Sequence, residues 1–456
     1  MGVLIMNRAD WLERASAAID KWEASFGPYR PHPSLSVTDA DFAAVFSDFC
    51  TRLENNYPYF HPTYAGQMLK PPHPAAIVGY LTAMMINPNN HALDAGPATA
   101  QMEKESIVQL AEMFGFGSHL GHLTSSGTIA NLEALFVARE LHPDRGVAYS
   151  ADAHYTHGRM CQVLRMEGHK VPVDAYGRMD LDALETLLRT GRVGTVVLSA
   201  GTTGLGSVDS IHEALALRAR YGVRLHIDAA YGGFFTLLAG AELPADDWRA
   251  IASCDSVVID PHKHGLQPYG CGAVIFADPT VGRFYAHDSP YTYFTSQELH
   301  LGEISLECSR AGAAAAALWL TFQLLPPVRE GLGAVLAATR NAASLWAKAI
   351  EHSPRLSLYQ EPDLDIVTYL PRVESMSAID EVAHRMLAEG MSDRESPIYL
   401  STLRVSADDF AKRGRPVVRD RPDARILRSV LMKPEAEQHI EDLHTRVERL
   451  AADVVG

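Results

Sequence analysis

The sequence predicts an α/β protein whose central sheet is mostly parallel and is covered by helices on both faces. Between about residues 100 and 330, short β-branched apolar runs typical of buried strands alternate with segments of helical length. Several of these runs stop at a polar residue or a glycine that begins a loop. Ligands of such sheets bind beyond the carboxyl ends of the strands, so we expect the functional residues in these loops.

Composition narrows the class of protein. The 456 residues are 47% hydrophobic and 21% charged, which is ordinary for a globular enzyme of two or three domains. The net charge of −15 argues against a nucleic-acid or anionic-membrane partner. Five cysteines without CxxC spacing fit a reducing cytoplasm and no structural metal. The sequence shows neither a secretory signal nor a run of about 20 apolar residues, so we expect a cytoplasmic protein.

The N-terminal part, residues 1–95, is expected to be a helical arm involved in dimerisation. Apolar residues recur at helical spacing over 9–26 and 38–54. Proline- and aromatic-rich chain follows at 57–64 and is a poor free-standing domain, so it is expected to pack on another surface, such as that of a partner subunit. The chain after Gln67 runs into a turn-rich loop.

Residues 96–335 are expected to form the large domain that carries the parallel sheet. Helices are predicted at 100–114 and 127–140. The predicted strands lie near 146–150, 169–173, 195–199, 223–227, 256–260 and 272–276. An alanine-rich run at 313–325 indicates a buried helix that ends before two prolines.

Residues 336–456 are expected to form a smaller C-terminal α/β domain, entered by a long helix at about 330–352. Its pattern is strand, helix, strand, helix, over 364–370, 378–388, 399–405 and 435–452. The basic residues between Lys412 and Arg428 indicate a solvated loop, or alternatively a stretch that attracts an acidic substrate.

Two predicted strand ends carry the residues that a particular cofactor requires. One run ends in the motif DPHKHG, which delivers Lys263, and an earlier run ends at Asp228. Pyridoxal phosphate (PLP) needs a lysine for its Schiff base and an acid that keeps its pyridine nitrogen protonated. Small residues after Asp228, including Ala230, leave room for a flat ring.

A phosphate site is predicted at Ser126, Gly127 and Thr128, where small residues open a helix. Free N–H groups and the helix dipole favour an anion at such a position, and the hydroxyls add donors. Simple helix capping is the alternative interpretation.

Two further loops supply candidate ring contacts. His154 follows a strand and is placed to stack on a cofactor ring; a metal pair with His157 and an ordinary surface histidine are the alternatives. Thr203, in a glycine-rich loop after another strand, is placed to reach the ring's phenolic oxygen. A phosphate cup, a ring stacker, a hydroxyl donor, an acid and a lysine thus occur on five separate element ends.

At these residues the sequence resembles the group II PLP-dependent amino-acid decarboxylases. The resemblance spans about residues 57 to 335 and includes NPNN, AGPATAQME, TSSGTIANLEAL, AGTTGLGSVD, HIDAAYGG and DPHKHG. DPHKHGLQPYG and SRAGAAAAALW look most like the bacterial tyrosine decarboxylase and archaeal tyrosine/aspartate decarboxylase branch.

The resemblance implies the aspartate-aminotransferase-like fold, known as PLP fold type I, with a sheet of the seven-stranded type, and a homodimer with active sites at the interface. It implies that Lys263 forms the Schiff base, Asp228 pairs with the ring nitrogen and His154 stacks on the ring. His262 joins Ser126, Gly127 and Thr128 at the phosphate, and Thr203 lies near the ring oxygen. His264 departs from the family, where an aromatic or aliphatic residue often follows the lysine, and is a candidate substrate contact.

The resemblance also implies a reaction, in which an L-amino acid loses carbon dioxide to give the amine. Tyrosine is the favoured type of substrate, and aspartate or glutamate is the acidic alternative. Tyr291 or Tyr293 is the expected proton donor, with packing aromatics as the alternative. Arg404 is expected to bind a substrate carboxylate or to form a structural salt bridge. Oxidative decarboxylation to an aldehyde, transamination and PLP binding without catalysis are the competing functions.

Overall fold

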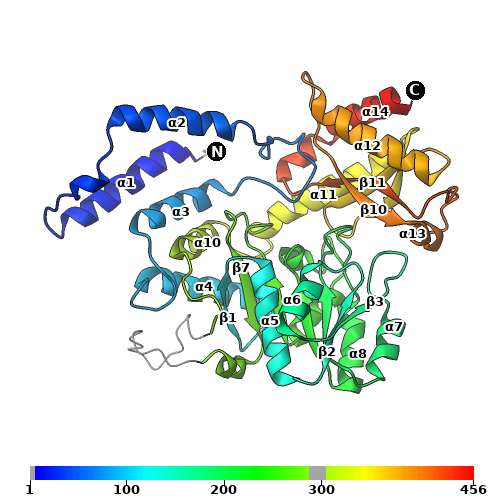
Figure 1. Cartoon of the computed structure of the whole chain (residues 1–456), viewed down its shortest axis with the longest axis horizontal. Coiled ribbons are helices and arrows are strands. Elements are labelled where there is room, and N and C mark those ends of the chain that lie inside the picture. Colours follow the sequence, from blue (N-terminus) through cyan, green and yellow to red (C-terminus); the bar gives the residue numbers. More distant parts are fainter. Residues whose placement is uncertain (1–5, 287–303, 456) are drawn as a thin grey trace.

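A computed structural model describes residues 6–286 and 304–455, and it confirms the predicted α/β fold (Figure 1). A seven-stranded sheet has the order β1-β7-β6-β5-β4-β2-β3, in which only β7 runs antiparallel to its neighbours within the described chain. Its strands are β1 (Leu120–Thr124), β2 (Gly146–Ser150), β3 (Gly168–Val171), β4 (Val193–Ser199), β5 (Arg224–Asp228), β6 (Ser256–Ile259) and β7 (Gly272–Phe276).

The inner strands are apolar on both sides because helices cover both faces of the sheet. In β6, Val257 and Ile259 belong to the same core cluster as Leu110, whereas Val258 packs in a different cluster with Ala130. The helices of this part are α4 (Pro97–Phe114), α5 (Gly127–Leu141), α6 (Thr156–Leu164), α7 (Leu181–Leu188), α8 (Ile211–Tyr221), α9 (Asp246–Ala250) and α10 (Gly312–Leu324).

The parallel strands bring several loops to one edge of the sheet. Ser199, at the end of β4, is paired with Asp228, at the end of β5. The neighbouring β6 ends at Ile259 and continues into the loop that holds Lys263. Asp228 and Lys263 therefore lie at the carboxyl ends of adjacent strands, at the same edge of the sheet.

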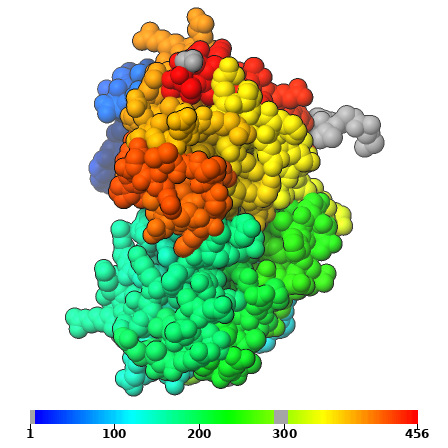
Figure 2. Space-filling view, turned by 90° about the vertical axis from the view of Figure 1, so that its right-hand side faces the viewer, coloured from blue at the N-terminus to red at the C-terminus, as the bar shows by residue number. Residues whose placement is uncertain are grey.

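The C-terminal part is built on a four-stranded antiparallel sheet of order β10-β11-β9-β8. Figure 2 shows the yellow and orange chain of this part resting on the cyan and green chain of the seven-stranded part. The strands are β8 (Leu356–Gln360), β9 (Ile366–Pro371), β10 (Ser401–Ser406) and β11 (Asp423–Val430), and the helices are α11 (Leu332–Glu351), α12 (Met376–Ser392), α13 (Ala407–Lys412) and α14 (Ile440–Val455).

One expectation for this part is wrong. The basic stretch does not remain a solvated loop to its end, because β11 begins at Asp423 and is an inner strand paired with both β10 and β9. Burial of Ala424 and Ile426 stabilises the strand, and the charge of Arg425 is neutralised by Asp380. The strands β1 and β8 were also absent from the predicted set.

The N-terminal arm consists of α1 (Arg8–Ala24) and α2 (Asp39–Leu53), which extend away from the body as the blue helices of Figure 1. Neither helix has a buried residue. The next helix, α3 (Pro74–Ile86), was not predicted, although Pro74 at its first position is favourable there. Short 3-10 helices occupy Pro33–Leu35, Gly233–Leu238, Ile251–Ser253, Pro279–Phe284 and Pro434–Gln438. In the part of the chain that the structure describes, no helix has the length and apolar character needed to span a bilayer.

Candidate active site

A cavity of about 230 Å³ lies at the carboxyl edge of the seven-stranded sheet and gathers residues from widely separated loops. Lys263, Asp228 and His154 all line it. The predicted cofactor contacts Ser126, Gly127, Thr128, Thr203, Ala230 and His262 line it as well. The topology thus brings together residues that the sequence places more than a hundred positions apart.

Lys263 lies in a tight loop after β6. Its Nζ atom is 3.0 Å from Oδ2 of Asp260, and its side chain is 21% exposed, so the amine is accessible from the cavity. The loop is strained: Leu266 has φ of 62°, a left-handed conformation that costs a non-glycine residue of order 1–3 kcal/mol. Gly265 is required, because a Cβ atom there would lie 2.7 Å from the Cα of Pro261.

Asp228 ends β5 and is held by two donors. Its Oδ2 accepts a hydrogen bond from Nε2 of His157 at 2.8 Å, and its Oδ1 accepts one from the N–H of Ala230 at 3.2 Å. Burial alone would raise the pKa of this carboxyl, but the hydrogen bond and charge of His157, together with Lys263, hold it well below its usual range. The group is therefore an anion within the cavity wall.

His154 is the candidate ring stacker. Its Nδ1 accepts the N–H of Thr156 at 3.3 Å, which fixes the ring at the start of α6. Burial lowers its pKa, an effect that the charge of Asp228 only partly opposes. The imidazole is consequently uncharged near neutral pH and presents a flat face. The alternative partner for a metal pair, His157, is committed to Asp228.

The start of α5 forms the anion-binding end of the cavity. Ser126 caps the helix through a hydrogen bond of 3.4 Å that its hydroxyl accepts from the N–H of Ile129, and this residue also lines the cavity. Gly127 lies close to Asp260, because a Cβ atom at this position would lie 2.7 Å from a carboxylate oxygen of that residue and would displace it. Nearby, Nδ1 of His262 donates to the carbonyl of Cys271 at 2.8 Å. The free N–H groups of this first turn suit a phosphate.

The structure adds residues that sequence reasoning missed. Asp260, Asn131 and Tyr231 line the cavity, and His157 supports Asp228 from behind. Asp260 begins the DPHKHG motif and Asn131 lies one turn into the helix, so proximity to the motifs was an available signal. His157 lies three residues after His154, but only the tertiary contact reveals its role.

Two predicted substrate contacts lie away from the cavity. The side chain of His264 is buried, and its ring nitrogens contact Asp365 and the carbonyl of Tyr231. The side chain of Arg404 is 74% exposed and lies 3.9 Å from Asp423. Tyr291 and Tyr293, the candidate proton donors, fall outside the described residues.

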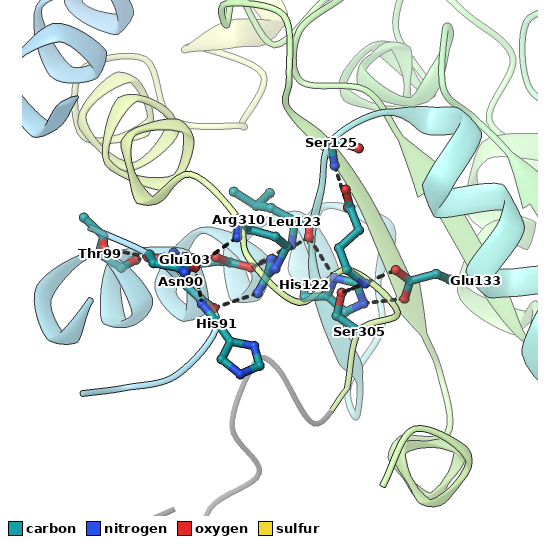
Figure 3. A network of polar contacts seen from close by, with 12 residues as sticks. Asn90, His91, Thr99, Glu103, His122, Leu123, Ser125, Glu133, Ser305 and Arg310 are labelled. Atoms are coloured by element: carbon teal, nitrogen blue, oxygen red, sulfur yellow. Dashed lines mark hydrogen bonds and ion pairs between the residues drawn. The ribbon is translucent and has the colours of Figure 1, made fainter. Parts of the chain in front are cut away.

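A polar network contacts the chain that leads into α5, at the anion-binding end of the cavity (Figure 3). Glu307 accepts the N–H of Ser125 at 2.8 Å, next to the capping Ser126. Further along the same segment, Arg310 pairs with Glu103 at 2.5 Å and donates to the carbonyl of Leu123 at 2.6 Å. These bonds fasten the end of β1 and thereby the loop that enters α5.

The chain is similar to known proteins over most of its length. The model for the pyridoxal-dependent decarboxylase conserved domain matches residues 32–371. The chain is 28% identical to L-tyrosine decarboxylase of Enterococcus faecium, covering 80% of this chain and 77% of that one. It is 30% identical to a probable L-tyrosine/L-aspartate decarboxylase of Methanothermobacter thermautotrophicus, covering 67% and 82% of the two chains.

Solved structures show the same fold. Mouse CSAD superposes with a TM-score of 0.79 at 20% identity, covering 98% of this chain and 99% of that one. The structure of Oryza sativa TDC with PLP and tryptamine superposes with a TM-score of 0.80 at 16% identity, covering 100% of both chains.

The chain belongs to the pyridoxal-dependent decarboxylase family. It is an enzyme that decarboxylates an amino acid with pyridoxal phosphate as cofactor. The residues present fit this cofactor: the cavity combines an accessible amine at Lys263, an ionised carboxylate at Asp228 and a helix start at Gly127. These three groups suit the three chemical features of PLP: the amine suits its aldehyde, the carboxylate suits its ring nitrogen and the helix start suits its phosphate.

Proposed function

We propose that this cavity decarboxylates an aromatic L-amino acid to the amine and carbon dioxide, with Lys263 anchoring the cofactor through its amine. The observation that carries the proposal is that Lys263 and Asp228 line one cavity together with His154 and the start of α5. When bound, pyridoxal phosphate supplies an electron sink for the electron pair that stays on the substrate α-carbon as carbon dioxide leaves.

Each side chain has a distinct task in this proposal. The Asp228 carboxylate holds a proton on the ring nitrogen, and His157 keeps that carboxylate ionised and oriented. The uncharged His154 packs on the ring face. Ser126, Gly127, Thr128 and His262 hold the phosphate, Thr203 lies near the ring oxygen, and Ala230 leaves space for the ring.

Tyr291 or Tyr293 is proposed as the proton donor to the substrate carbon. Replacing each in turn by Phe tests this, because the variant that lacks the donor should lose amine formation while still binding cofactor. Unchanged amine formation in both variants would remove the assignment.

The aromatic preference is supported by the lining of the cavity. Tyr155 and Tyr231 contribute aromatic surface, and no arginine lines the cavity in the described part of the chain. An acidic side chain is usually bound by a guanidinium, and Arg404, the candidate for that role, lies outside this lining. Relatives named L-tyrosine decarboxylase support the aromatic preference, and relatives named L-aspartate decarboxylase make an acidic amino acid the alternative substrate.

Incubation of the purified protein with the twenty amino acids and DOPA tests the function. We expect carbon dioxide and the amine in equal amounts from an aromatic substrate, with no oxygen consumption, and no product from Lys263→Ala. Turnover of aspartate or glutamate alone would overturn the substrate preference. An aldehyde product with oxygen uptake would assign oxidative decarboxylation, and cofactor binding without any product would overturn catalysis.

We further propose that the protein is a cytoplasmic homodimer joined through its N-terminal arm. The exposed apolar side chains of α1 and α2, such as Trp22, Phe42 and Phe46, form a surface that a second copy of this arm could cover. Cys161, Cys254 and Cys271 are free and buried, which suits a reducing compartment. The proposed division is an arm at 1–95, a PLP-binding domain at 96–335 and a C-terminal domain at 336–456.

A further inference from the structure

A buried polar cluster joins the C-terminal part to the cavity from outside it. Asp365, which directly precedes β9, is fully buried. Its Oδ2 accepts a hydrogen bond from Nε2 of His264 at 2.7 Å, and its Oδ1 accepts one from the hydroxyl of Tyr231 at 2.5 Å. His264 is the next residue after Lys263, and Tyr231 lines the cavity. One carboxylate thus contacts two of the loops that form the site, the one after β5 and the one that holds Lys263.

The hydrogen-bond partners of His264 and Asp365 define the geometry of this cluster. Nδ1 of His264 faces the carbonyl of Tyr231 at 2.9 Å, and Nε2 faces Asp365, so both ring nitrogens face groups that only accept. Burial would raise the pKa of Asp365, but His264, Tyr231 and the nearby Lys70 together lower it, which keeps the carboxylate ionised. The ring of His264 is therefore held between a backbone carbonyl and a buried carboxylate, directly beside the reactive lysine.

The geometry of the Lys263 loop explains why it needs such support. Leu266 has a left-handed φ of 62°, and strained backbone persists only where surrounding contacts hold it. The N–H of His73 donates to the carbonyl of Leu266 at 2.9 Å and fastens one end of the turn. The pair with Asp365 fastens its middle.

From these contacts we infer that Asp365 is a positioning residue. It acts through His264 and Tyr231 and fixes the position of the Lys263 amine relative to the part of the cavity wall that contains Tyr231. This inference rests on the proposed function, in which Lys263 carries the cofactor. It also gives His264 a role that differs from substrate contact: the histidine is a link between the C-terminal part and the catalytic loop.

Asp365→Asn tests the inference, because asparagine keeps the shape of the side chain and removes its charge. We expect the affinity of the apo-protein for pyridoxal phosphate and the kcat to fall about tenfold or more, since small displacements of a reacting group are costly. KM should change much less. The visible absorption of the bound cofactor should shift, because it reports the surroundings of the Lys263 amine.

His264→Gln is the milder variant, which keeps an N–H donor toward Asp365 but loses the ring that also contacts the carbonyl of Tyr231, and it should show intermediate losses. His264→Gln combined with Asp365→Asn should lose no more than the more damaging of these two single variants, because the two residues act as one unit. Asp380→Asn is the matched control: this buried carboxylate pairs with Arg425 in the C-terminal part, away from the cavity. The control should lower the melting temperature and leave cofactor affinity, absorption and kcat unchanged.

The outcomes distinguish a failure of the positioning role of Asp365 from a failure of the proposed function. If Asp365→Asn and His264→Gln keep wild-type cofactor affinity, absorption and kcat and lose only thermal stability, the inference is overturned and the proposed function stands. If the wild-type protein itself shows no visible cofactor absorption, both are overturned.

Discussion

Asp228 depends on a neighbour that does not reach the cavity lining. His157 is completely buried and donates to the carboxylate at 2.8 Å, so it stabilises the ionised form that the ring nitrogen requires. A charge-assisted hydrogen bond of this kind is worth about 1.5–3 kcal/mol.

We predict that His157→Phe lowers kcat by about 10- to 100-fold, because the carboxylate of Asp228 loses its charge-assisted donor and its pKa rises. Steady-state kinetics and the pH dependence of kcat measure the effect. His157→Gln, which retains an N–H donor, should recover most of the rate. A His157→Phe enzyme with the wild-type pH profile would contradict this role.

We predict that Gly127→Ala weakens pyridoxal phosphate binding by about tenfold or more, because the new Cβ would lie 2.7 Å from Asp260 and displace the start of α5. Equilibrium titration of the apo-protein with cofactor measures the change. Gly117→Ala is a matched control, since a Cβ there meets no atom within 4 Å. Equal affinities of the two variants would argue against this account of the helix start.

At the scale of the elements, the N-terminal helices expose aromatic side chains that no other part of the described chain buries. On α2, Phe42, Phe46 and Phe49 are 59%, 50% and 52% exposed and follow one another along the helix. Amphipathic helices normally bury such a stripe, so a partner surface is the simplest explanation.

We predict that Phe42→Asp combined with Phe46→Asp converts the proposed dimer to monomers at micromolar concentration, because two charges would be buried in an apolar contact. Losing about 2 kcal/mol per aromatic anchor corresponds to roughly 30-fold in affinity for each. Sedimentation equilibrium measures the mass. Asp39→Asn, at the exposed start of the same helix, should leave the mass unchanged. A double variant that stays dimeric would place the interface elsewhere.

At the scale of the whole molecule, a buried charged pair between two neighbouring elements also binds a segment that is distant in sequence. His122 in β1 and Glu133 in α5 are fully buried and 2.8 Å apart, and Glu133 also accepts the N–H of Leu306 at 3.3 Å (Figure 3). Burial alone would lower the pKa of His122, but the charge and hydrogen bond of Glu133 raise it above its usual 6.5.

The pair of His122 and Glu133 should make the stability of the protein depend on pH. Because the folded-state pKa of His122 is raised, its stabilising contribution is complete below pH 6.5 and is lost as pH rises through the folded value. Glu133→Gln should therefore melt well below the wild type at pH 6, and the difference should narrow at higher pH. Glu140→Gln, at a partly exposed pair with Arg139, should show a small difference at every pH. A gap that widens with pH would contradict the assignment.

The sequence was sufficient for the fold class and for the chemistry of the site. Strands such as β4 and β6 are recognisable because burial on both faces demands β-branched residues, and a lysine and an acid at strand ends indicate pyridoxal phosphate without any coordinates. It misplaced β11, because charges such as Arg425 indicate solvent until a partner such as Asp380 is known.

Only the tertiary structure decided which polar groups meet. His157, Asp365 and Tyr231 are ordinary residues in the sequence, and their roles arise from contacts across 71 and 134 positions. The periodicity of apolar residues in a segment shows which of its faces is buried, because burial selects apolar residues on that face. The partner of a buried charge is fixed by the packing of the whole chain, and that information is not carried by any short stretch of sequence.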